Sequence, residues 1–105
     1  MSIESAISAF RSRSAAPAAF EAFGEDCAAL ARRDPLNAGF YVMLGLLARS
    51  FTERSEGRPL TAAAAHEAKA HLIEQAERVA PALGLGPEAK LALLNDLAHA
   101  LAAGR

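Results

Sequence analysis

Apolar residues recur along the chain at the spacing of a helix. In the segment 17–33, Phe20, Phe23, Cys27 and Leu30 follow one another at intervals of three or four residues. That interval places side chains on one face of an α-helix. No stretch of the sequence alternates apolar and polar residues over the length of a strand. The pattern therefore predicts an all-α protein.

Capping residues and prolines divide the chain into five expected helices. Proline suits the first turn of a helix, and Ser, Thr or Asp side chains accept hydrogen bonds from the first amides. Such residues precede or open each apolar-periodic segment: Ser2, Pro17, Asp34 with Pro35, Thr61 and Pro87. Gly57 is placed to end the third helix in a left-handed conformation, and Pro81 should kink or end the fourth. In the last helix we expect an inward face made by Leu91, Leu94, Ala98 and Leu101.

The connections between these helices are short, which favours antiparallel neighbours. We expect residues 1–105 to form a single domain. Its architecture should be a small antiparallel helical bundle of four main helices plus a short N-terminal helix. Composition supports the fold class, because Ala occurs 27 times and Leu 14 times, whereas the β-branched residues Val, Ile and Thr together occur seven times.

The third expected helix, within residues 38–55, is apolar on two faces. At about 100° per residue, the two stripes lie roughly 100° apart. One stripe holds Phe40, Leu44, Leu47 and Phe51, and the second holds Gly39, Met43, Leu46 and Ser50. Because large exposed apolar patches are uncommon on monomers, the second stripe needs a cover. The helix is then central in the monomer, or it lies at an interface, or it lines a ligand pocket.

The charge of the chain limits its partners. The net charge is -1, and no basic face is evident, which argues against nucleic acid. No apolar run approaches the roughly 20 residues of a membrane span, so we expect no membrane partner. The N-terminal segment lacks the features of a secretory signal, and the single Cys27 cannot form an internal disulfide. A cytoplasmic protein is therefore the expectation.

The stretch HEAKAH resembles the zinc-peptidase pattern, but its spacing differs. Its histidines, His66 and His71, are five positions apart, which separates them by about 140° around a helix. Glu67, His71 and Glu74 do share a face, and they are the alternative set of ligands if the protein binds a metal. The same count places that face away from the apolar stripe of the helix. We therefore expect the row to face water, with Glu67 paired to His71 and Glu74 to Arg78.

Catalytic chemistry has little support in the sequence. Cys27 falls within an apolar stripe, which predicts a buried, inert thiol rather than a nucleophile. The chain contains no GxSxG, P-loop or GxGxxG motif, so no cofactor is expected. The sequence favours a non-catalytic, homo-oligomeric protein-interaction module. Its expected partner is a second copy of the chain, in a homodimer, or another protein. The expected contact residues are Gly39, Met43, Leu46 and Ser50; the alternative is a helical bundle that binds a metal or a small hydrophobic ligand.

Overall fold

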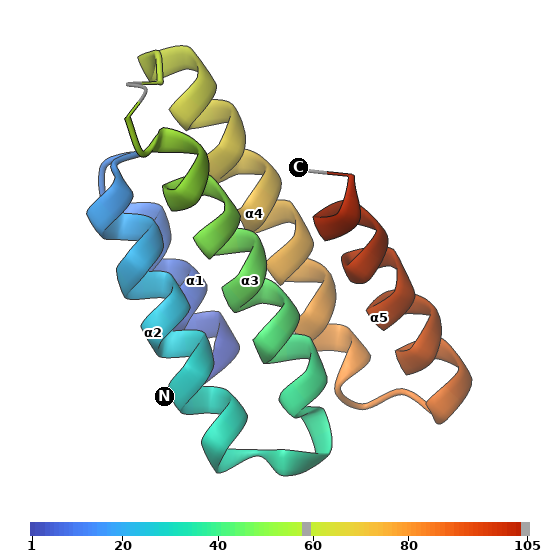
Figure 1. Cartoon of the computed structure of the whole chain (residues 1–105). Coiled ribbons are helices and arrows are strands. Elements are labelled where there is room, and N and C mark those ends of the chain that lie inside the picture. Colours follow the sequence, from blue (N-terminus) through green and yellow to red (C-terminus); the bar gives the residue numbers. More distant parts are fainter. Residues whose placement is uncertain (58–59, 104–105) are drawn as a thin grey trace.

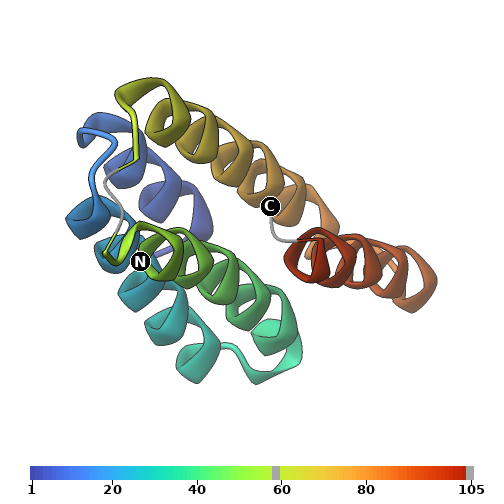
Figure 2. The ribbon, with the colours of Figure 1, turned by 45° about the horizontal axis from the view of Figure 1, so that its top comes forward.

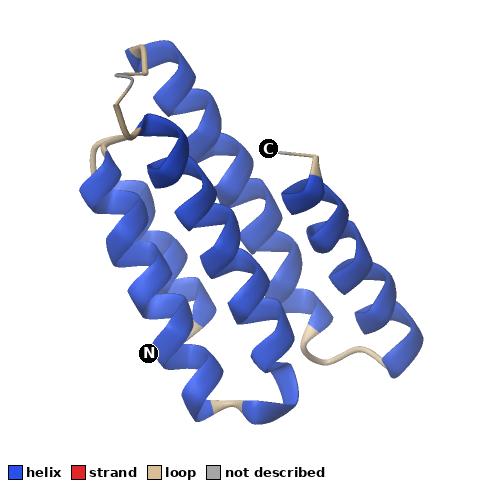
Figure 3. Cartoon of the chain, in the orientation of Figure 1, coloured by secondary structure: helices blue, strands red, loops and turns tan. Residues whose placement is uncertain are grey.

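The observed helices begin close to the residues that the sequence marks. The structure is a computed structural model that describes residues 1–57 and 60–103. Within those ranges it consists of helices and their connections, without a strand (Figure 3). The elements are α1 (Ile3–Ser12), α2 (Pro17–Arg33), a 3₁₀ turn η1 (Pro35–Asn37), α3 (Ala38–Ser55), α4 (Ala62–Ala82) and α5 (Pro87–Ala102) (Figure 1). The all-α prediction is confirmed.

Local hydrogen bonds explain where α1 and α4 begin. The Ser2 hydroxyl accepts from the backbone N–H of Ser5 at 3.1 Å, and the Ser5 hydroxyl accepts from the N–H of Ser2 at 2.9 Å. Thr61 Oγ1 accepts from the N–H of Ala64 at 3.1 Å. Each bond satisfies an amide that has no partner in the first turn of a helix. Side chains within three residues of the helix start are therefore enough to define these boundaries.

The start of α3 differs from the expectation that Asp34 and Pro35 open it directly. Asn37 Nδ2 donates to Asp34 Oδ2 at 2.9 Å, so the Asp34 carboxylate binds a side chain instead of the first amides of α3. One 3₁₀ turn intervenes, and α3 begins at Ala38. At the other end, Gly57 has φ 71°, as predicted for a left-handed stop.

Helix α3 is the central element of the bundle. It contacts α2, α4 and α5, while α1 packs against α2 and α4 on the far side (Figure 2). Part of the second apolar face of α3 is therefore covered by α5 of the same chain. In the described part of the chain, no helix is both long and apolar enough to cross a membrane.

An aromatic cluster joins the first three helices. The Phe20 ring stacks on Phe51 of α3 with centroids 3.8 Å apart, and it meets Phe10 of α1 edge-on at 5.1 Å. Phe10 also stacks on Phe23 at 4.9 Å. All four side chains are buried, so this cluster fixes how α1 and α3 pack on α2.

The rotation of α5 differs from the prediction. Leu97 is 0% exposed and Leu93 is also buried, whereas Leu91 is 59% exposed and Ala98 lies in solvent. The other two residues of the expected face, Leu94 and Leu101, are partly buried and pack against the core. Leucines are frequent enough along this helix that more than one face satisfies helical spacing. Polar contacts to neighbouring elements accompany the observed rotation: Arg78 to Asp96 at 2.8 Å, and Lys90 to Asn37 at 3.0 Å.

Candidate functional site

The four residues that the sequence predicts to contact a partner, Gly39, Met43, Leu46 and Ser50, lie in different surroundings. A Cβ added to Gly39 would lie 3.6 Å from Leu94 Cδ1, so Gly39 lies against α5. Met43 and Ser50 are half-buried, and Met43 packs against the core. Leu46 is 37% exposed. Of the four, Leu46 is the one that lines an open hollow of the surface.

That hollow is a groove between α2 and α3, on the side away from α1, α4 and α5. Its volume is about 460 Å³. Val42, 49% exposed, and Leu46 contribute apolar surface from α3, while Phe20 and Tyr41 are buried beneath. The lining residues are Phe20, Glu21, Gly24, Glu25, Ala28, Tyr41, Val42, Gly45, Leu46, Arg49 and Thr52.

Two glycines form the floor of the groove. A Cβ on Gly24 would lie 3.9 Å from the Gly45 carbonyl oxygen, and a Cβ on Gly45 would lie 3.8 Å from that of Gly24. Each glycine lies inside a helix, where it costs about 1 kcal/mol relative to alanine. An added Cβ at either position would make ordinary van der Waals contact with the opposite helix, and glycine at both positions leaves the centre of the groove without side chains. We call the face formed by Glu21, Gly24, Glu25 and Ala28 of α2 and by Val42, Gly45, Leu46 and Arg49 of α3 the α2–α3 face.

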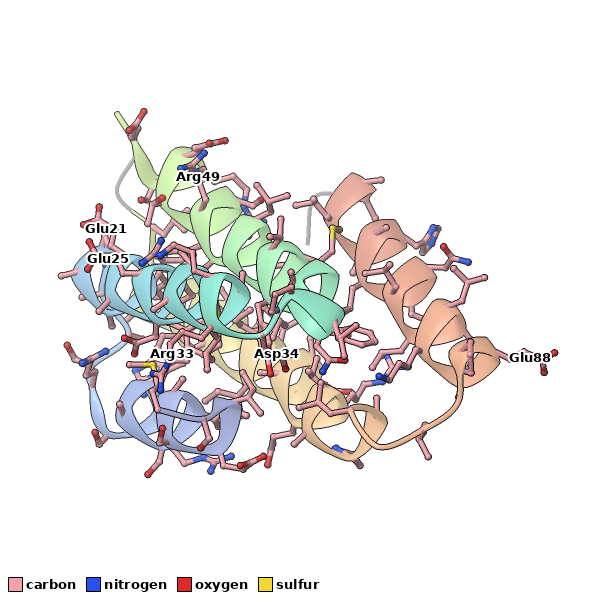
Figure 4. The ribbon with its side chains drawn as sticks, turned by 90° about the horizontal axis from the view of Figure 1, so that it is seen from below. Glu21, Glu25, Arg33, Asp34, Arg49 and Glu88 are labelled. Carbon is pink, nitrogen blue, oxygen red and sulfur yellow. The ribbon has the colours of Figure 1, made fainter. Side chains whose placement is uncertain are left out.

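The two walls of the α2–α3 face carry opposite charge. Glu21 and Glu25 project from α2, and Arg49 projects from α3 on the same outer side of the helix pair (Figure 4). All three side chains are exposed. Arg49 forms no ion pair with either glutamate among the described residues, where the ion pairs are Arg11–Glu77 and Arg78–Asp96. The charges of this face are therefore available for a partner.

The row Glu67, His71 and Glu74 differs from the prediction that it faces water. The two glutamates are exposed, but His71 is half-buried and its Nε2 is fully buried without a hydrogen-bond partner. The expected pair of Glu74 with Arg78 is replaced, because Arg78 binds Asp96 on α5. The described residues contain no group of three or more His, Cys, Asp or Glu side chains able to hold a metal ion.

His71 turns inward because its ring completes an apolar contact between α4 and α3. It borders a small hollow of about 20 Å³ together with Leu47, Phe51 and Leu72. A hollow of that size accommodates about one water molecule. It is too small for a hydrophobic ligand, so it does not serve the ligand-binding alternative.

Burial changes the acidity of two side chains in the core, Cys27 and Tyr41. Burial, with a smaller effect of Asp26, raises the pKa of the Cys27 thiol to about 12. The thiolate is the nucleophilic form, so this thiol is inert near neutral pH. Burial also raises the pKa of Tyr41, and the nearby Asp34 carboxylate acts in the same direction. The prediction of a buried Cys27 is confirmed.

Sequence reasoning missed most of the α2–α3 face. It identified Leu46 but not Val42, the two glycines or the charged walls. One signal was present: Gly24 and Gly45 each interrupt an otherwise strong helical pattern. A glycine in such a position often marks close packing of two helices, but the sequence does not show which helices meet.

Comparison with protein-family models, with curated proteins and with solved structures returned no match to this chain. The chemistry and shape of the α2–α3 face are therefore the basis for a functional assignment.

Proposed function

We propose that the protein is a non-catalytic protein-interaction module that binds its partner on the α2–α3 face. The observation that carries this proposal is the pair of exposed apolar side chains, Val42 and Leu46, beside a groove with a glycine floor. Apolar side chains flanked by a charged rim are typical of protein interfaces. A bound helix fits such a groove, because its side chains enter where Gly24 and Gly45 leave space.

Two further observations support a protein partner over a small molecule. The groove runs between α2 and α3 along their length, and exposed side chains border it. Small-molecule sites, in contrast, usually enclose most of their ligand. The buried thiol of Cys27 and the inward ring of His71 also lie outside the groove lining. Among the described residues, no group of three or more His, Cys, Asp or Glu side chains that could hold a metal ion accompanies the groove.

Site-specific photo-crosslinking in the cells that produce the protein tests this proposal. A benzophenone amino acid replaces Leu46, and in a matched control it replaces Leu91, an exposed leucine on α5. We expect a covalent protein adduct from position 46 and none from position 91. Equal labelling from both positions, or no protein adduct from position 46, would refute the proposal. The mass of the adduct distinguishes a second copy of the chain from another protein.

A further inference from the structure

The α2–α3 face is complementary to itself, and this complementarity identifies a partner. Helices α2 and α3 run antiparallel, and Gly24 lies against Gly45. Because an α-helix rises about 1.5 Å per residue, positions equally far from these glycines in opposite directions lie at equal height. Leu46 is then level with Gly24, Val42 with Ala28 and Arg49 with Glu21, each to within about one residue.

We infer that the partner is a second copy of this chain, related by a two-fold axis that runs along the groove. This inference rests on the proposed function of the α2–α3 face. Rotation about that axis keeps every residue at its height and places α2 of one subunit over α3 of the other, antiparallel. Helix α2 of each subunit then packs on α3 of the other subunit, and the four helices form a closed interface.

The side chains that meet in this arrangement fit by size. Leu46 of one subunit lies over Gly24 of the other, and Val42 lies over Ala28. The exposed apolar side chains of α3 therefore meet the smallest residues of α2, which leave room for them. By symmetry, the same contacts occur twice in the dimer.

The charges select this arrangement over the other symmetric one. With the axis along the groove, Glu21 of each subunit faces Arg49 of the other, and Glu25 lies about one helical turn further along the same wall. Two sets of opposite charges then form, one on each side of the axis. With the axis across the groove, α2 lies on its own copy and the acidic walls meet, which is unfavourable. Glu53, the next charged residue on α3, lies one turn beyond Arg49 and outside the groove lining.

A charge exchange provides the test. One variant carries Arg49→Glu, and a second carries Glu21→Arg with Glu25→Arg. Alone, each variant places like charges against each other on both sides of the two-fold axis. Mixed, the two variants restore opposite charges on both sides. We expect each variant alone to dimerise at least about tenfold more weakly than the unmodified chain, and the equimolar mixture to form a heterodimer of near-original affinity. Sedimentation equilibrium over a wide concentration range measures these affinities, and circular dichroism checks that both variants remain helical.

A disulfide cross-link checks the register without changing charge. Chains carrying Ala28→Cys are mixed with chains carrying Val42→Cys, and Cys27 remains because it is buried. We expect the mixed pair to cross-link faster on oxidation than either variant with itself. The two-fold arrangement would be overturned if the charge variants dimerised with unchanged affinity, or if Ala28→Cys cross-linked faster with itself than with Val42→Cys. Either result would leave the proposed interaction function unaffected. An unmodified chain that stays monomeric at every concentration would overturn the inference of a second copy, and the adduct from position 46 would then decide the proposed function separately.

Discussion

Lys69 fixes the C-terminus of α1 to α4, and its removal should destabilise the fold measurably. Its Nζ donates to the carbonyl oxygen of Arg11 at 3.0 Å and to that of Arg13 at 2.5 Å. These carbonyls lie at the end of α1, where oxygens lack helical partners and the helix dipole favours a positive charge. The ammonium also lies 5.9 Å from the centre of the Phe10 ring.

The substitution Lys69→Met keeps the apolar stem and removes the charged donor. A hydrogen bond to a charged group contributes about 1.5–3 kcal/mol, and exposure of these bonds to solvent reduces that contribution. We expect a loss of about 1–2 kcal/mol in the free energy of unfolding. For a domain of this size, that loss lowers Tm by about 5–10 °C.

Lys90→Met is the matched control, because Lys90 makes one hydrogen bond, to Asn37 Oδ1 at 3.0 Å. Its loss should cost about 0.5–1 kcal/mol. Urea unfolding followed by circular dichroism gives both values, with an unchanged m-value showing that the same transition is compared. If Lys69→Met lowers the free energy of unfolding by less than about 0.5 kcal/mol, the two carbonyl contacts of Lys69 do not stabilise the protein, and the reasoning is refuted.

Two further predictions concern the core. Leu97→Ala should destabilise the fold by about 2–5 kcal/mol, and Leu91→Ala by less than about 0.5 kcal/mol, because the Leu97 side chain is 0% exposed and that of Leu91 is 59% exposed. Equal losses of stability in urea unfolding would show that α5 has a different rotation. Burial raises the pKa of the Cys27 thiol from 9.0 to about 12 in the folded protein. Between these pH values the thiol ionises only in the unfolded chain, so the free energy of unfolding should fall as pH rises from about 9 to 12. Tyr41 adds to this fall because burial raises its pKa too, and a Cys27→Ala variant that shows the same fall would rule out the contribution of the thiol.

Helix boundaries were predictable because the interactions that define them are local. Ser2 binds an amide three residues away, and Thr61 does the same at α4. The proline at position 17 opens α2 as expected. Pro81 lies in the last turn of α4, which ends one residue later at Ala82. The one exception, at Asp34, arose because the carboxylate had a competing partner in Asn37.

The rotation of a helix and the position of a site depend on contacts that the sequence does not reveal. Lys69 binds carbonyl oxygens 56 and 58 residues away, and carbonyl oxygens have no signature in a sequence. The angles around α4 alone predict that His71 faces solvent. Its neighbours Leu47 and Phe51 belong to α3, and they border the same small hollow as the ring, whose Nε2 is buried without a hydrogen-bond partner.

The apolar pattern of α3 indicates that two faces need cover, but it does not indicate how far each neighbour reaches. Gly39 and Leu46 lie within about 20° of each other around the helix. Even so, Leu94 of α5 covers Gly39, whereas Leu46 borders the groove. The exposed part of this face is therefore narrower than the stripe in the sequence, and it has two partly exposed apolar side chains. Obligate dimers bury larger and more apolar surfaces. A subunit with a complete aromatic core and so narrow a face should fold alone and associate reversibly, which makes charge at Arg49 and Glu21 important for selecting the partner.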